Sequence, residues 1–117
     1  MTERIRRFLS DGRPEGPCLV FDLEVVRDPP RAFRRATPGP HIFSAANANP
    51  APEILAALAE LGSSFDCASV AEIDMALAAG ATPERISFGN TIKKERDVAA
   101  ASARGIDLFA IDCAAEA

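Results

Sequence analysis

The sequence has no tryptophan and no tyrosine, and it is poor in the residue types that build metal sites and nucleophilic sites. Its single histidine, His41, leaves no material for a histidine-based catalytic triad or a zinc site. The cysteines, Cys18, Cys67 and Cys113, are odd in number and far apart, without metal-ligand spacing. We therefore expect no metal, and three buried thiols in a reducing compartment.

Long hydrophobic runs are also missing. No apolar stretch approaches the roughly 18 residues that a membrane span needs, and the first residues lack the basic-then-apolar order of a signal peptide. We therefore expect a cytoplasmic protein with no membrane contact. Thirteen basic against seventeen acidic residues give a net charge of −4, which argues against a nucleic-acid partner because the phosphate backbone demands a basic face. The basic cluster at 4–8 is expected to be a solvated helix face.

What the chain does have is a hydrophobic fraction of 48% in 117 residues, enough for one domain with a core. Short apolar runs rich in Phe and Ile alternate with segments of helical periodicity, a pattern typical of a parallel sheet covered by helices and therefore of an α/β fold. The expected strands, whose starts recur about every 22 residues, are 41–47, 63–69, 86–90 and 106–112. The expected core is Val20, Phe43, Leu55, Leu58, Phe65, Ile73, Leu77, Ile86, Phe88, Val98, Leu108 and Ile111.

Start and stop signals bracket three helices between these strands. Ser69 can cap the second helix, with Glu72 at the position that a capping box requires. Glycine follows each helix, because it adopts the left-handed conformation of a helix end at the least cost. The expected starts are Pro52, Ser69 and Thr91, and the expected stops are Gly62, Gly80 and Gly105.

The region before the first repeat is less regular. The run "CLVFDLEVVRD" at 18–28 predicts one more strand, followed by a helix that Asp22 caps. Pro29 and Pro30 interrupt this helix, and an interior proline costs roughly 3 kcal/mol through a lost hydrogen bond and a steric clash. We expect the helix either to stop at Asp28 or to be strained.

Polar side chains collect at the predicted carboxyl ends of the strands, where parallel strand–helix architectures bind their ligands. Asp66 stands inside an apolar run, and because a buried carboxylate needs a partner we interpret it as functional. Ser69 and Thr91 are equally interpretable as helix caps. Lys93 and Lys94 either are solvated or contribute to a phosphate site at a helix start. The polar set comprises Asn47, Asn49, Asp66, Ser69, Asn90 and Asp112.

Four segments resemble, in order, the N-terminal part of the ornithine/diaminopimelate/arginine decarboxylases: "PCLVFDLEVV", "ANANP", "GSSFDCASVAEI" and "ISFGNTIKK". The run "FDCASVAEI" is most similar to the bacterial type of ornithine decarboxylase. The resemblance covers the chain from about Gly16 onward, and it implies an alanine-racemase-like barrel with pyridoxal 5'-phosphate as cofactor. It divides the chain into an N-terminal extension, 1–15, and a truncated pyridoxal-phosphate-binding barrel domain, 16–117.

The resemblance also implies site residues. The family strand F-Y-A-V-K-A-N-P carries the lysine that forms the imine with the cofactor, and Asn47 stands in the place of that lysine. Because an amide nitrogen has its lone pair delocalised, it cannot form the imine, and covalent cofactor binding is not expected. Asp66 and Glu72 match family positions near the cofactor and the reactive lysine, so they are the implied cofactor-binding residues.

The resemblance further implies that the chain covers about half of a barrel. We expect the first half of a parallel (βα) TIM-type barrel, preceded by a strand and a helix and without a C-terminal β domain. It would be an N-terminal fragment of an ornithine or basic amino-acid decarboxylase of the polyamine-biosynthesis lineage, inactive alone. Three interpretations stay open: a remnant without selected activity, a non-catalytic protein that dimerises with itself or with a full-length homologue through its unpaired strand edges, and a decarboxylase.

Overall fold

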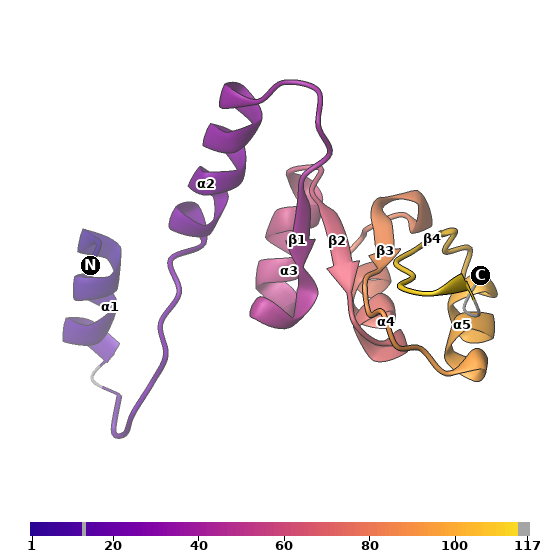
Figure 1. Ribbon diagram of the computed structural model, residues 1–117. Coiled ribbons are helices and arrows are strands. Elements are labelled where there is room, and N and C mark those ends of the chain that lie inside the picture. Colours follow the sequence, from indigo (N-terminus) through magenta and orange to yellow (C-terminus); the bar gives the residue numbers. More distant parts are fainter. Residues whose placement is uncertain (13, 115–117) are drawn as a thin grey trace.

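The described part of this computed structural model, residues 1–12 and 14–114, contains a four-stranded parallel sheet with helices packed against one face (Figure 1). The strands lie in the order β1-β2-β3-β4, and each is parallel to the next. Helices α3, α4 and α5 connect successive strands, which confirms the α/β class and the repeated strand–helix order. The strands are β1 (Phe43–Ala45), β2 (Ser64–Cys67), β3 (Ile86–Phe88) and β4 (Leu108–Phe109). The helices are α1 (Glu3–Gly12), α2 (Leu23–Ala36), α3 (Pro52–Glu60), α4 (Val70–Ala78) and α5 (Glu95–Ser102), with short 3₁₀ helices η1 (Ala46–Ala48) and η2 (Pro83–Arg85).

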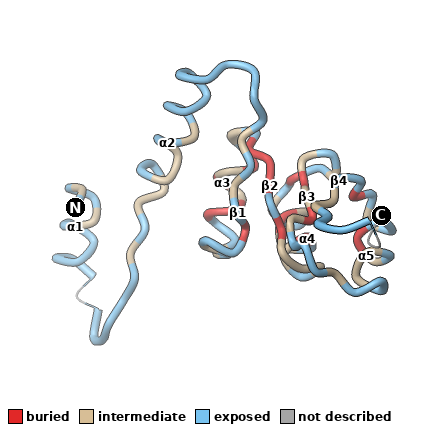
Figure 2. The backbone as a smooth tube through the Cα atoms, in the orientation of Figure 1, coloured by how far each residue is buried: buried red, intermediate tan, exposed pale blue. Residues whose placement is uncertain are grey.

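The register of the sheet gives its two faces different characters. Phe65 and Phe88 point toward the helices and are 0% and 2% exposed. Successive residues of a strand point to opposite faces, so the residues that alternate with them lie on the face that the helices leave uncovered, which we call the open face (Figure 2). A row of paired residues crosses the open face from β1 to β4: Ala45, Asp66, Ser87 and Leu108.

The core lies between the sheet and the helices (Figure 2). Five expected core residues are buried there, namely Leu55, Phe65, Ile73, Ile86 and Phe88. Four others are only half-buried, namely Val20, Leu58, Leu77 and Val98. The prediction is wrong for Phe43, Leu108 and Ile111, which are exposed. Phe43 and Leu108 belong to the open face, and Ile111 follows the last strand, so no helix covers them.

Only one of the cysteines is buried. Cys67 ends β2 beneath the helices, whereas Cys18 and Cys113 are exposed. The prediction of three buried thiols is therefore wrong for two of them. Both exposed cysteines lie outside the strands and helices that enclose the core.

The start and stop signals of the connecting helices are largely confirmed. Ser69 caps α4, since its Oγ accepts a hydrogen bond from the Glu72 backbone N–H at 3.3 Å. Pro52 is the first residue of α3. Thr91 does not cap α5, which begins only at Glu95 and has no side-chain cap. The expected stops Gly62, Gly80 and Gly105 have φ of +74°, +97° and +83°.

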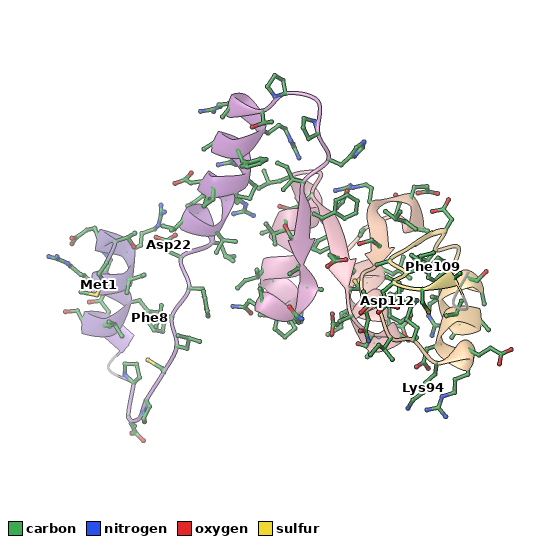
Figure 3. The ribbon with its side chains drawn as sticks, in the orientation of Figure 1. Met1, Phe8, Asp22, Lys94, Phe109 and Asp112 are labelled. Atoms are coloured by element: carbon green, nitrogen blue, oxygen red, sulfur yellow. The ribbon has the colours of Figure 1, made fainter. Side chains whose placement is uncertain are left out.

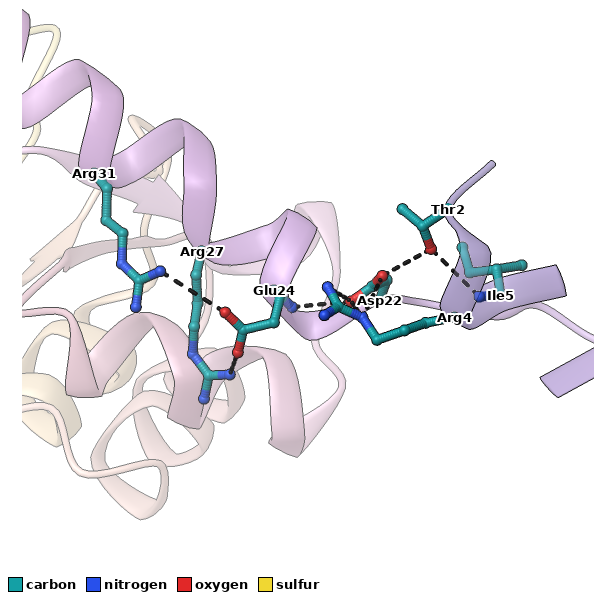
Figure 4. Close-up of polar contacts among 7 residues, drawn as sticks. All are labelled: Thr2, Arg4, Ile5, Asp22, Glu24, Arg27 and Arg31. Carbon is teal, nitrogen blue, oxygen red and sulfur yellow. Dashed lines mark hydrogen bonds and ion pairs between the residues drawn. The ribbon is translucent and has the colours of Figure 1, made fainter. Parts of the chain in front are cut away.

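An N-terminal arm, α1 and the residues up to Asp22, extends away from the sheet (Figure 1). The strand expected at its end is wrong: residues 17–22 form no strand, because no other strand of the described residues lies beside them to complete a ladder. Asp22 caps α2 as expected, accepting from the Glu24 N–H at 3.2 Å. Its carboxylate also accepts hydrogen bonds from Thr2 and Arg4, which fastens α1 to the start of α2 (Figure 4).

Helix α2 runs through both prolines, so it does not stop at Asp28. Pro29 and Pro30 lack the N–H groups that would bond to the carbonyls of Val25 and Val26. None of the residues of α2 is buried, so solvent can reach the carbonyl groups that lack a protein donor. Of the described helices, none is long and apolar enough to cross a membrane.

Candidate functional site

Four of the polar residues singled out from the sequence lie at the carboxyl ends of β1 and β2, while Asn90 follows β3 and Asp112 follows β4, both exposed. At the end of β1 the chain turns into η1, which leaves Asn47 exposed. Helix η1 contacts both β2 and α4. Asn49 has a structural role, because its Oδ1 accepts the Ala51 N–H at 3.1 Å just before α3 begins. Asn47 therefore lies exposed in the short helix that directly follows β1, at this end of the sheet.

Asp66 is exposed on the open face, although a buried carboxylate was expected. It alternates along β2 with Phe65 and Cys67, which are both 0% exposed, so its side chain points away from the helices. The Ser87 hydroxyl donates to Asp66 Oδ1 at 2.6 Å. Gly89 makes room for the carboxylate, since a Cβ on residue 89 would lie 2.0 Å from Oδ1. Two residues of the β3 segment therefore fix this carboxylate in place.

A shallow hollow of about 240 Å³ surrounds this carboxylate. Its walls are mostly apolar and come from β1, β2, the β3 segment and β4 with the residue after it. A charged group at the edge of an apolar hollow is typical of a small-molecule site, although the hollow is smaller than the clefts that hold drug-sized ligands, roughly 300 Å³ and more. The lining residues are Phe43, Asp66, Ser87, Gly89, Leu108, Phe109 and Ala110.

Glu72 is engaged in shaping the start of α4. Its Oε2 accepts the Ala68 N–H at 2.8 Å, and its Oε1 accepts the Ser69 hydroxyl at 3.2 Å. This is a variant of the capping box in which the glutamate reaches the N–H one residue before the cap. The carboxylate oxygens thus satisfy local donors, and Glu72 sits at the same end of the sheet as Asp66.

The Cys67 thiol is buried close to these carboxylates. Burial, followed by the nearby negative charges of Glu72 and Asp66, raises the pKa of Cys67 to about 12. A thiol with such a pKa is protonated at neutral pH and is a poor nucleophile. Cys67 is therefore part of the packing beneath the site.

Lys93 and Lys94 are the only lysines of the chain, and they lie in the loop before α5. Lys93 folds back over the sheet end, where its Nζ donates to the carbonyls of Asn90 and Ala110 and lies 6.0 Å from the centre of the Phe88 ring. Lys94 is exposed and immediately precedes the first residue of α5 (Figure 3). The predicted phosphate site at a helix start requires both lysines in the first turn of α5, which is not where they lie.

A covalently held pyridoxal phosphate needs an amine at this end of the sheet. The carboxylate and the apolar hollow could lie against a ring, but position 47 carries an amide, and the two lysines follow β3 rather than β1. The residues therefore do not fit a covalently held cofactor. Within residues 1–12 and 14–114, no cluster of His, Cys, Asp and Glu could hold a metal ion.

Sequence reasoning missed Ser87 and Gly89. Both sit on the β3 segment more than 20 residues after Asp66, and only the pairing of Asp66 with Ser87 brings them to the carboxylate. The available signal was the equal spacing of the repeats, which places residue 87 beside residue 66 once the strands are assumed to be in register.

Known proteins of similar sequence and structure were compared with the chain. Residues 23–117 match the model of the pyridoxal-binding domain of pyridoxal-dependent decarboxylases. The chain is 41% identical to the chloroplastic ornithine decarboxylase of Nicotiana glauca over 96 residues, which are 82% of this chain and 22% of that protein. It is 34% identical to antizyme inhibitor 2 of Xenopus laevis over 113 residues, 96% of this chain and 25% of that protein.

A similar structure supports the same relationship. The crystal structure of the lysine decarboxylase from Selenomonas ruminantium matches with a TM-score of 0.86 and 34% sequence identity, over 99% of this chain and 30% of that chain. The chain thus spans between 22% and 30% of the length of these three proteins.

Proposed function

The chain belongs to the pyridoxal-dependent decarboxylases, and we propose that it forms the first βα units of the cofactor barrel of a decarboxylase for ornithine or a related basic amino acid, without activity of its own. The similarity to an ornithine decarboxylase and a lysine decarboxylase supports this substrate class. The parallel sheet with helices on one face supports its place in a TIM-type barrel. Pyridoxal phosphate is the cofactor of this family.

The single observation that carries the inactivity is Asn47 at the end of β1. When bound as an imine, pyridoxal phosphate supplies the electron sink for decarboxylation. The amide of Asn47 cannot supply the amine for that link, because its nitrogen lone pair is shared with the carbonyl. Asp66, held by Ser87, would still present a negative charge at the open face, but without a covalent anchor beside it.

The direct test is trapping of the imine by borohydride, followed by peptide mass mapping. Four proteins are compared. Two keep Asn47: the unsubstituted chain and a Lys93→Arg/Lys94→Arg variant, called the arginine variant. The other two are the Asn47→Lys derivatives of these. Because the chain has no other lysine, any lysine adduct on the Asn47→Lys derivative of the arginine variant must lie at residue 47. We expect no specific adduct on the arginine variant, and an adduct at residue 47 once lysine is introduced.

Turnover is measured in parallel as carbon dioxide released from ornithine and lysine with added cofactor. We expect no release above the solvent background from the unsubstituted chain. Any release above that background would contradict the proposal, and its loss in the Lys93→Arg/Lys94→Arg variant would identify one of these lysines as the amine that holds the cofactor. An absent adduct on the Asn47→Lys derivative would show that position 47 is not at the cofactor site.

A second candidate function is non-catalytic binding of a full-length relative. It is favoured by the exposed open face and by the similarity to antizyme inhibitor 2, a protein named for inhibiting antizyme. Sedimentation of a mixture of this chain with a full-length ornithine decarboxylase would test it. A mixed species of defined mass supports the binding role, and independent sedimentation at micromolar concentration ends it.

A further inference from the structure

Two arginines from different elements meet at the turn that leads from α3 into β2. Arg34, in the last turn of α2, donates from Nη1 to the Leu61 carbonyl at 2.5 Å. Arg85, the last residue of η2, donates from Nη2 to the Ala59 carbonyl at 3.5 Å and also to the Ser63 carbonyl. These bonds engage one nitrogen of each guanidinium and, within the described residues, leave the other N–H groups of both side chains without a protein acceptor.

Gly62 leaves open space beside both arginines. Its φ of +74° is the left-handed conformation that follows many helices. A Cβ on residue 62 would lie 3.5 Å from Arg34 Nη2 and 3.9 Å from Arg85 Nη2, and no atom outside residues 61–63 would be closer to it than the Arg34 guanidinium. One point next to the backbone is therefore within 4 Å of both guanidinium groups, and no side chain fills it.

Neither arginine is neutralised by a carboxylate within the described part of the chain, where no acidic side chain forms an ion pair with Arg34 or Arg85. Glu60, the last residue of α3, pairs instead with an arginine in the first half of α2 at 3.1 Å. Glu84 accepts a hydrogen bond from the Thr82 side chain, which lowers the pKa of its carboxyl. The ends of α2 and α3 each add about half a negative charge, so about one positive charge remains at the turn.

We propose that Arg34, Arg85 and the backbone at Gly62 bind a phosphate group, as free phosphate or as a phosphate monoester. The planar fork of a guanidinium matches two oxygens of a phosphate, and two guanidinium groups match the charge of the dianion. The glycine leaves room for the anion beside the backbone. This site lies at the amino ends of β2 and β3, whereas Asp66 lies near the carboxyl end of β2. The inference therefore goes beyond the proposed function and depends neither on Asn47 nor on pyridoxal phosphate.

The test is a titration of the isotope-labelled chain with inorganic phosphate and, separately, with glycerol phosphate, at constant ionic strength. The amide resonances of Leu61, Gly62 and Ser63 are expected to shift and to saturate at millimolar phosphate, and chloride at the same ionic strength should not reproduce the shift. A saturable shift with either compound supports the proposal, and the tighter of the two identifies the source that the site prefers. The absence of a saturable shift with both compounds overturns it.

Substitutions then separate a specific site from general attraction to a basic helix. Arg34→Gln removes one guanidinium and leaves the bonds of Arg85 in place, so we expect the phosphate dissociation constant to rise by at least about tenfold. Arg35→Gln is the matched control, because it removes the same charge from the next position of α2, and within the described residues Arg35 forms no hydrogen bond to the turn. We expect the control to change the dissociation constant by less than about twofold, since an exposed charge away from the anion is screened.

Arg34→Lys keeps the charge but loses the planar fork, and it should bind phosphate nearly as weakly as Arg34→Gln. Amide resonances far from the turn that match those of the unsubstituted chain show that each variant is folded. Arg85→Lys is the second variant, and it should weaken binding in the same way if both guanidinium groups hold the anion. Equal weakening by Arg34→Gln and Arg35→Gln would overturn the proposal, as would full binding by both lysine variants.

Discussion

The Asp66 carboxylate lies across the backbone of Gly89, so closely that a Cβ on residue 89 would lie 2.0 Å from Asp66 Oδ1. The backbone of Gly89 is not left-handed, so the space that the carboxylate occupies is the reason for glycine at this position. Ser87, on the same segment, donates to the same oxygen at 2.6 Å. Two residues of one strand segment thus determine where the charge of the neighbouring strand lies.

The Gly89→Ala substitution is expected to lower the free energy of unfolding by about 1 kcal/mol, because the carboxylate must rotate and lose its bond to Ser87. In an Asp66→Ala background the same change should cost much less, since the obstructing atoms are gone. Urea unfolding of the four proteins of this double-mutant cycle measures the difference. An equal cost in both backgrounds would mean that Asp66 is not the obstacle.

Replacing Pro29 and Pro30 by alanine is expected to stabilise α2, because each proline in a helix interior is disfavoured by up to about 3 kcal/mol relative to alanine. The gain should appear as slower hydrogen exchange of the α2 amides and as more helical circular dichroism. Pro52→Ala is the matched control, since a proline at the first position of a helix costs little. Unchanged exchange in the double variant would show that the prolines do not limit α2.

The attachment of α1 should depend on pH below about 4. The hydrogen bond from Arg4, followed by that from Thr2, lowers the pKa of Asp22 from its ordinary value of 3.8. The folded state therefore favours the charged carboxylate, whose contribution is complete above the ordinary pKa and is lost as the pH falls through the lower folded pKa. The amide resonance of Ile5, which donates to Thr2, should shift over this range.

Asp22→Asn should remove this pH-dependent step, whereas Asp11→Asn, which changes a carboxylate within α1 itself, should leave it in place. If the Ile5 resonance shifts equally in the Asp22→Asn variant, a group other than Asp22 controls the attachment of α1.

The three thiols should separate into two classes on alkylation. Cys18 and Cys113 are exposed and should react with iodoacetamide at pH 8, while Cys67 is buried with a pKa of about 12 and should not. Mass spectrometry should count two labels on the native chain and three after unfolding in urea. A third label on the native chain would indicate that α4 opens away from β2 on the time scale of the reaction.

Local features were predictable from the sequence because the atoms involved are neighbours in the chain. The cap of α4 by Ser69 and the capping role of Asp22 each join groups two or three residues apart. The glycine stops follow from the conformation of single residues. The strand–helix repeat fixed the order of elements and the parallel sheet, because short links between apolar strands and helices leave few other arrangements.

The predictions failed where the outcome depended on partners distant in the sequence. The apolar run that begins at Cys18 predicted a strand at the end of the arm, but a strand exists only where another strand pairs with it, and none lies there among the described residues. The prolines of α2 predicted either a stop at Asp28 or strain; the stop is wrong because the helix continues to Ala36, and the strain stays a prediction. Asp66 was expected to be buried because its neighbours are, yet β2 is covered on one face only.

What the sequence determined by itself is the repeated strand–helix order from β1 to β4, the caps of α2 and α4 and the chemistry available at each strand end, including an amide at position 47. These depend on backbone conformation and residue type, which are properties of short segments. The tertiary structure alone decided that Ser87 and Gly89 hold Asp66, and that Asp66 lies on the face of the sheet that the described helices leave uncovered. Those facts arise from strand register and helix placement, which bring together groups that the chain keeps 20 residues or more apart.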